Sequence, residues 1–327
     1  MKSMQSETWA LLVGVTVVGL VGCSSDGGVS THGETSDAEQ SALYKAPIDT
    51  KHPFAVGVCT GPLNTDPAYG EIGACSHKGT VARCTGSLIA PNLVLTARHC
   101  VNEMVGESSD DYQCGELTFG PKPPFAGGVR VTTSHTVMSD HPVWIDVKRV
   151  LVSPFGNDFC NDDVALLILK ENVTRVTPAW VDLDRDIHVN PPSDGKFAIV
   201  GRGIISHTDD GNLERRYLTD IPFLCADACD LPWNEGKFVF HQAKGQFAFG
   251  QSIDSGDSGA GILLNETFHD AQPTIVGVES SGLEDPLTIP SGGIAVGLHH
   301  HRGWLTAGAY TAAKAGGYPV PAWAHGD

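Results

Sequence analysis

Three short segments contain side chains that could together cleave an acyl bond. The first ends in His99-Cys100, the second contains Asp163, and the third places Ser258 between glycines. A serine hydroxyl is a weak nucleophile at neutral pH and becomes reactive when an imidazole accepts its proton. A carboxylate must orient that imidazole. The order His, Asp, Ser therefore predicts acyl transfer through a serine nucleophile.

Two other interpretations of these residues are weaker. An α/β-hydrolase would need the order Ser, Asp, His and a G-x-S-x-G turn, whereas here the second glycine is displaced to Gly261. His99 and Asp163 could also be ordinary buried polar residues, and Ser258 an ordinary turn serine. Asp162 competes with Asp163 for the role of the carboxylate, and we expect Asp162 to be its solvated neighbour.

The elements that position these residues read as short strands. The chain has 38 Gly and 20 Pro, both of which interrupt helices, and short apolar runs recur between turn signals from residue 53 onward. Neither a fixed-period repeat nor a strand–helix alternation is present, which disfavours a solenoid or a doubly wound sheet. We expect a mostly β protein, a barrel or sandwich, with a helix over about residues 300–314.

Composition excludes several classes of function. With 41% hydrophobic and 18% charged residues, the 327-residue chain can bury a core, which excludes wholesale disorder. Its formal charge of −17 disfavours binding to a phosphate backbone. We therefore expect no nucleic-acid partner.

Four local motifs follow one another along the chain: C-T-G-S-L-I at residues 84–89, T-A-R-H-C at residues 96–100, D-V-A-L-L at residues 163–167 and G-D-S-G at residues 256–259. Through these motifs, the region from about Pro53 to Tyr310 resembles the trypsin/chymotrypsin-type serine endopeptidases. Gly201-Arg202-Gly203 stands where the family usually has G-W-G. The resemblance implies an all-β fold of two six-stranded antiparallel β-barrels with a C-terminal helix.

The resemblance also assigns roles to individual residues. Ser258 would be the nucleophile, His99 the general base and then acid, and Asp163 the carboxylate that orients His99. Backbone N–H groups of Gly256 and Ser258 would form the oxyanion hole. Asp257 would receive the α-amino group that activating cleavage creates.

The same resemblance implies a primary specificity pocket. Its floor would be Ser252, which is not a carboxylate, and we therefore expect an apolar or small residue before the scissile bond. Asp254, near the rim, leaves open the attraction of a basic side chain. Ser280 and Gly282 would form the substrate-binding edge, and Gly293 the far wall.

The activation region departs from the family pattern. Ile48 is the candidate for the new N-terminus, and cleavage after Lys45 is the alternative. Without either cut, Asp257 would lack its ammonium partner and the enzyme would be weak or inactive.

The first residues read as an export signal. Lys2 precedes an apolar stretch, Trp9–Val21, of about 13 residues, shorter than the roughly 20 that span a bilayer. Leu20-Val21-Gly22-Cys23 resembles the lipobox of bacterial lipoproteins, in which Cys23 is lipidated and becomes the N-terminus. An ordinary signal peptide is the alternative. Ser24, at the position after Cys23, resembles the signal for sorting of lipoproteins to the outer rather than the inner membrane.

These signals divide the chain into four parts. We expect a lipoprotein signal peptide at residues 1–22, a flexible tether or pro-segment at 23–46, the protease domain at 47–315 and a tail at 316–327. The protein would then be an outer-membrane or cell-surface lipoprotein, or otherwise secreted or periplasmic.

Eight of the nine cysteines remain once Cys23 is lipidated, an even number in a compartment that permits disulfides. The resemblance pairs Cys84 with Cys100. We expect no metal site, because the thiols lack paired C-x-x-C steps. Proximity suggests Cys59 with Cys75 and Cys225 with Cys229, which leaves Cys114 with Cys160.

The sequence therefore predicts an exported, lipid-anchored serine endopeptidase that acts on proteins or peptides without a cofactor. The alternative is a catalytically silent protease homologue that binds partners at the cell surface. Neither the substrate nor the oligomeric state follows from the sequence.

Overall fold

The computed structural model describes residues 46–76, 82–106, 114–121, 126–138, 141–204, 213–226, 229–230, 239–240, 245–250, 255–285 and 288–325. The predicted export signal, Cys23, Lys45, Ser252 and Asp254 lie outside these ranges.

The first barrel is a closed antiparallel sheet in the order β1-β2-β3-β8-β7-β6. β3 and β8 are buried along their whole length, as expected of continuous apolar runs. β3 ends three residues before His99, and β8 begins two residues after Asp163. The pairing of the two strands therefore brings these two predicted catalytic residues together. The strands are β1 (Ala55–Thr60), β2 (Ala82–Ala90), β3 (Leu93–Thr96), β6 (Val129–Thr132), β7 (Trp144–Val152) and β8 (Ala165–Leu169).

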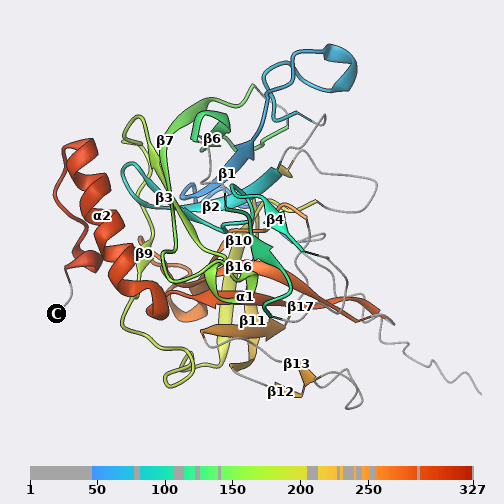
Figure 1. The fold of residues 1–327 in the computed structure, drawn as a ribbon, viewed down its shortest axis with the longest axis vertical. Coiled ribbons are helices and arrows are strands. Elements are labelled where there is room, and N and C mark those ends of the chain that lie inside the picture. Colours follow the sequence, from blue (N-terminus) through green and yellow to red (C-terminus); the bar gives the residue numbers. More distant parts are fainter. Residues whose placement is uncertain are drawn as a thin grey trace, which may run out of the picture. The chain divides into compact units, whose positions relative to one another are not determined.

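The second barrel has the order β15-β10-β11-β14-β17-β16 and closes through pairing of β15 with β16. Figure 1 labels its strands β10, β11, β16 and β17. A short strand, β9 (Trp180–Val181), adds to β16 in parallel. The two closed barrels confirm the predicted fold class. The barrel strands are β10 (Lys196–Gly201), β11 (Arg216–Ala226), β14 (Gln246–Gly250), β15 (Gly261–Leu264), β16 (Thr274–Asp285) and β17 (Thr288–Gly297).

In the described part of the chain, two α-helices and two hairpins lie outside the barrels. The helix α1 (Phe159–Asp162) precedes β8, and α2 (Arg302–Gly316) forms the predicted C-terminal helix. No helix within the described ranges combines the length and apolarity needed to cross a membrane. The hairpins pair β4 (Met104–Val105) with β5 (Thr118–Phe119), and β12 (Cys229–Asp230) with β13 (Val239–Phe240).

The helix α2 packs one face on the first barrel. Leu305, Ala309 and Ala312 are buried in the core that includes β8, whereas Tyr310 is 51% exposed. These buried positions follow the spacing of one helical face. Ala309 therefore lies on the buried face of the helix, and its neighbour Tyr310 does not.

Three disulfides join described cysteines, in pairings expected from the sequence. They link Cys59 to Cys75, Cys84 to Cys100 and Cys114 to Cys160. Cys225 is also disulfide-bonded, and the side chain of Cys229 lies outside the described part of the chain.

Candidate active site

The pairing of β3 with β8 brings His99 and Asp163 together. His99 follows β3 by three residues, and Asp163 lies between α1 and β8. The Nδ1 atom of His99 is 2.7 Å from Asp163 Oδ2, and the His99 backbone N–H donates to Asp163 Oδ1 at 2.8 Å. These two contacts fix both the ring and the loop that carries it.

Ser280 completes the environment of the carboxylate. Its hydroxyl donates to Asp163 Oδ2 at 2.6 Å, and Asp163 is fully buried. Ser280 was predicted at the substrate-binding edge, and its side chain is directed to the carboxylate. The family motif locates Ser280 in the sequence but does not predict its hydrogen bond to Asp163.

Asp163 also determines the protonation behaviour of His99. Burial lowers the pKa of His99, but the charge of Asp163 and its hydrogen bond raise it, and the net result is a pKa above the usual 6.5. The His99 side chain is 16% exposed, so part of it remains accessible from outside the protein.

The neighbouring Asp162 is not solvated, contrary to the expectation from sequence. It is buried and accepts a hydrogen bond from the Ser153 hydroxyl at 2.7 Å. The turn of α1 directs the two adjacent aspartates to different partners. This separates their roles, because only Asp163 contacts His99.

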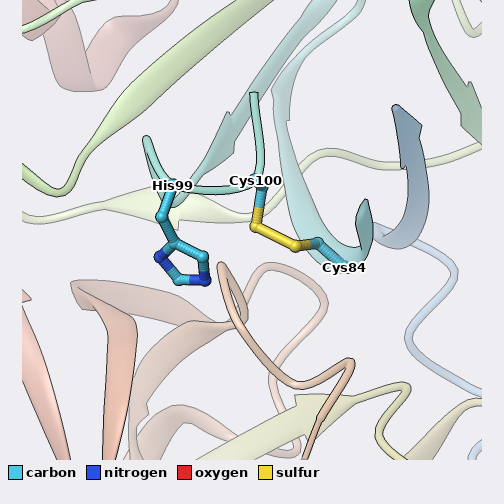
Figure 2. A group of neighbouring side chains, drawn as sticks. All are labelled: Cys84, His99 and Cys100. Atoms are coloured by element: carbon cyan, nitrogen blue, oxygen red, sulfur yellow. A yellow bond between two sulfur atoms is a disulfide. The ribbon is translucent and has the colours of Figure 1, made fainter. Parts of the chain in front are cut away.

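Ser258 is held against β2. The Thr85 N–H donates to the Ser258 carbonyl at 2.9 Å, and the Thr85 hydroxyl donates to the Gly256 carbonyl at 2.8 Å. Sγ of Cys100 lies 3.7 Å from the same Ser258 carbonyl. His99 and Cys100 are adjacent, so the Cys84–Cys100 disulfide braces the His99 segment (Figure 2). The contact of Cys100 with the Ser258 carbonyl holds this segment beside Ser258.

Two glycines allow the tight course of the Ser258 loop. Gly256 has φ +104° and Gly259 has φ +85°, a region that disfavours other residues. A Cβ at Gly259 would also collide with Thr85 and Thr96. The G-D-S-G motif is thus required by the backbone as well as by chemistry.

The backbone N–H groups of Gly256 and Ser258 have no acceptor within the described ranges. They are free to stabilise a developing oxyanion. No hydrogen bond joins His99 to Ser258 Oγ among these residues, as is common for a nucleophile and its base before substrate binds.

Asp257 is fully buried and directly precedes Ser258. Its Oδ1 accepts a hydrogen bond from the Gly203 N–H at 2.6 Å. A side chain on Gly203 would collide with this carboxylate. Gly203 therefore fixes the position of the loop that carries Ser258.

Arg202, which replaces the family's usual tryptophan, is a buried link between the two barrels. It is 1% exposed and donates to four carbonyl groups, with no carboxylate among these acceptors. Burial and the nearby charge of Arg215 together lower its pKa to about 9, although the charge of Asp49 acts in the opposite direction. The acceptors belong to Ala55 at 3.2 Å, Ser134 at 2.6 Å, His135 at 2.8 Å and Leu213 at 3.4 Å.

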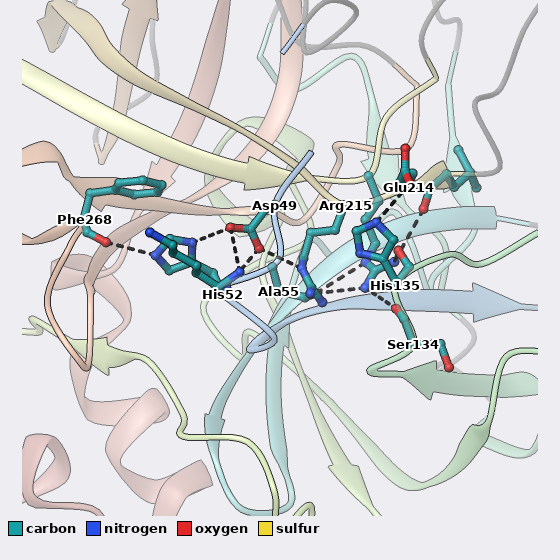
Figure 3. Close-up of polar contacts among 11 residues, drawn as sticks. Asp49, His52, Ala55, Ser134, His135, Glu214, Arg215 and Phe268 are labelled. Atoms are coloured by element: carbon teal, nitrogen blue, oxygen red, sulfur yellow. Dashed lines mark hydrogen bonds and ion pairs between the residues drawn. The ribbon is translucent and has the colours of Figure 1, made fainter. Parts of the chain in front are cut away.

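The segment before β1 is bonded to the second barrel (Figure 3). Asp49 forms a buried ion pair with Arg215 at 2.9 Å and contacts His52 Nδ1 at 2.6 Å, and His52 Nε2 lies 3.0 Å from the Phe268 carbonyl. Ile48, the candidate new N-terminus, is 48% exposed and forms a β-bridge with β11.

The remaining predicted pocket residues lie on β16 and β17. Gly282 pairs with Gly293, and a Cβ at Gly282 would meet nothing within 4 Å. At Gly293 a Cβ would collide with the ring of Phe249. The predicted pocket floor, Ser252, and Asp254 lie outside the described residues.

One group of potential metal ligands occurs in the described part of the chain. Cys84, His99 and Cys100 have ligand atoms within 4.8 Å of one another. The two sulfur atoms are bonded to each other, as Figure 2 shows, and a disulfide offers no thiolate. The group is therefore the disulfide-braced loop that carries His99 rather than a metal centre.

Two closed antiparallel barrels with a His–Asp pair beside a serine loop define the chymotrypsin-like class of serine proteases. Residues 65–305 match the family model described as Trypsin. The chain belongs to the trypsin family.

Known proteins agree with this assignment. The serine protease Hayan of Drosophila melanogaster is 26% identical over 249 residues, which cover 70% of this chain and 36% of that protein. The CLIP domain-containing serine protease B10 of Anopheles gambiae is 26% identical over 263 residues, covering 75% of this chain and 69% of that protein.

A solved structure shares the fold. An inactivated protease paralogue of the scabies mite has a TM-score of 0.53 and 19% identity, and the similarity covers 84% of this chain and 98% of that one. The fold alone therefore does not establish catalysis, which depends on the residues of the site.

Proposed function

We propose that this protein is a serine endopeptidase that hydrolyses peptide bonds through an acyl-enzyme on Ser258. The observation that carries the proposal is the hydrogen-bonded group of His99, Asp163 and Ser280 at the loop that holds Ser258. A silent homologue would have no need of a buried carboxylate that orients an imidazole.

The reaction follows from these positions. Ser258 Oγ attacks the substrate carbonyl carbon while His99 Nε2 accepts the hydroxyl proton, and Asp163 stabilises the imidazolium. The N–H groups of Gly256 and Ser258 bind the oxyanion. His99 then protonates the leaving amine, and water releases the acyl group by the same steps in reverse.

Export and lipidation form the second part of the proposal. Three disulfides support an oxidising, extracytoplasmic compartment. The relatives named above are insect proteins, so a lipid anchor on Cys23 and an outer-membrane or cell-surface location rest on residues 20–24 alone.

The test is covalent labelling with a fluorophosphonate, which reacts with activated serines. The purified protein should be labelled, and Ser258→Ala should abolish labelling and peptide hydrolysis without loss of the folded state. Ser255→Ala, three residues earlier on the same loop, is the matched control and should keep the label. A protein that is not labelled, before or after cleavage near residues 45–48, would be the silent homologue.

A further inference from the structure

Glu279 is a buried carboxyl group beside the nucleophile loop. It lies on β16, directly before Ser280. Its backbone accepts a hydrogen bond from the Gly259 N–H and donates one to the Ala260 carbonyl, both at 2.9 Å. These are the two residues that follow Ser258, so Glu279 is fixed next to the reacting centre.

The Glu279 side chain lacks any partner from the described part of the chain. It is 1% exposed, and neither Oε1 nor Oε2 has a hydrogen bond. The residues bonded or paired to its backbone, Gly259, Ala260 and Ala295, carry no polar side-chain atom. A buried carboxyl without a donor or a cation is costly, which suggests that the missing partner arrives from outside.

The charged groups around Glu279 are two other buried carboxylates. Burial raises the pKa of Glu279 well above its usual value, and Asp257 and Asp163 raise it further. Asp163 already accepts hydrogen bonds from His99 and Ser280, and Asp257 accepts one from Gly203. Of these three carboxyl groups, Glu279 is the one with no bound donor.

We propose that Glu279 is the specificity-determining residue that receives a basic side chain, arginine or lysine, from the substrate residue before the scissile bond. The inference rests on the proposed endopeptidase function. It differs from the apolar or small preference expected from Ser252, because β16 supplies a carboxylate that this expectation did not include.

The geometry places Glu279 within reach of such a side chain. One residue step of ~3.8 Å and one hydrogen bond separate Ser258 from the Glu279 backbone, and the four-carbon stem of lysine extends roughly 6 Å. Open space adjoins Gly282, further along β16, where a Cβ would meet no atom within 4 Å. A basic side chain can therefore approach along the predicted substrate-binding edge.

A bound metal ion fits the site less well. Calcium requires six to eight oxygen ligands that converge on one point. The oxygens of Asp163 and Asp257 already accept hydrogen bonds, which leaves Glu279 as the group that is free to bind. A guanidinium or ammonium group needs only one carboxylate and supplies its own donors.

The first test compares two peptides that differ only before the scissile bond, arginine in one and its neutral isostere citrulline in the other. The native protein should prefer arginine, and Glu279→Gln should lower the arginine-to-citrulline ratio of kcat/KM by about 100-fold. Glu266→Gln is the control, because Glu266 binds Ser193 at the surface. An unchanged ratio in Glu279→Gln, or an equal loss on both peptides, would overturn the inference.

A binding measurement separates this inference from the catalytic proposal. Benzamidine, an aromatic amidinium, should bind the native protein about 100-fold more tightly than neutral benzamide, and Glu279→Gln should remove the difference, as measured by calorimetry. Selective binding without fluorophosphonate labelling would mean that the catalytic proposal fails and the cation site stands. Labelling without preference for the amidinium would mean the reverse.

Discussion

Among the single residues of the site, Asp163 is held by three hydrogen bonds. Its carboxylate accepts three hydrogen bonds, from the His99 backbone, the His99 ring and the Ser280 hydroxyl. Because Nδ1 of His99 donates to Asp163, Nε2 is left without a proton and can act as the base. The tautomer required for catalysis is thus set before substrate binds.

Replacing Asp163 with asparagine should therefore disable the base. The Asn amide can donate to His99 Nδ1 and favour the wrong tautomer, so kcat/KM should fall by about 10⁴-fold. Asp163 raises the pKa of His99, so native activity should decline as the pH falls through a value above 6.5, and the residual activity of Asp163→Asn should decline at a lower pH. The measurement is the pH dependence of kcat/KM.

Ser280→Ala provides the graded comparison for Asp163→Asn, because it removes one of the three hydrogen bonds and keeps the carboxylate. The loss of kcat/KM in Ser280→Ala should be much smaller than in Asp163→Asn, about 10-fold. Equal losses in the two variants, or an unshifted acid limb in Asp163→Asn, would contradict this account.

Sequence patterns identified the candidate triad but missed Glu279. Residue type, spacing and order mark His99, Asp163 and Ser258, because these motifs are local. A glutamate in a strand normally faces solvent, and the burial of Glu279 arises because β16 pairs with both β15 and β17. Arg202 was missed as a structural link for the same reason, since its four acceptors come from distant segments.

At the scale of elements, the segment from Ala46 to His52 behaves as an extension of the second barrel. Asp49 donates its backbone N–H to the Arg215 carbonyl at 2.8 Å, and the Tyr217 N–H donates to the Pro47 carbonyl at 3.1 Å. Ile48 would have to break these bonds to enter the protein interior after cleavage.

Asp49 should make stability depend on acidic pH. Burial raises its pKa, but hydrogen bonds from His52 and the charges of His52 and Arg215 lower it to about 2 from 3.8. A depressed pKa stabilises the fold above the unfolded value, so about 2 kcal/mol present at neutral pH should be lost as the pH falls from about 4 to 2.

The measurement is urea unfolding of native protein and Asp49→Asn at pH 7 and near pH 2. The free energy of unfolding of the native protein should exceed that of Asp49→Asn at pH 7, and this difference should disappear near pH 2. Asp220→Asn is the control, because Asp220 pairs with Lys196 at the surface, and its effect should be smaller. A constant difference between native protein and Asp49→Asn across this range would exclude the buried ion pair as the cause.

The strands were predictable where their apolar runs were continuous. β3 and β8 carry such runs, and the family motifs at their ends fix their pairing. The closure of the second barrel by β15 and β16, and the parallel addition of β9, depend on contacts between residues far apart in sequence. Local periodicity contains no information about such pairings.

The molecule combines a protease fold braced by disulfides with a strongly acidic sequence, whose formal net charge is −17. A protein of this charge is repelled from anionic lipid surfaces. Stable residence on a membrane would therefore require a covalent anchor rather than surface electrostatics.

The residues around Cys23 predict such an anchor, and its strength can be argued from its chemistry. One acyl chain binds a bilayer only marginally, whereas two chains hold a protein stably. A diacylglyceryl group on the Cys23 sulfur would supply two chains. Cys23→Ser removes that sulfur, so the protein should move from the detergent phase to the aqueous phase on Triton X-114 partitioning and from membranes to the soluble fraction.

Ser24→Ala keeps the sulfur and should leave this partition unchanged. Equal partition of Cys23→Ser and the native protein into detergent would rule out the lipid. Because the protease fold begins more than twenty residues beyond Cys23, at Ala55 in β1, fluorophosphonate labelling should be the same in both variants. If Cys23→Ser is released from the membrane but is still labelled by the fluorophosphonate, the anchor determines where the enzyme acts and not whether it acts.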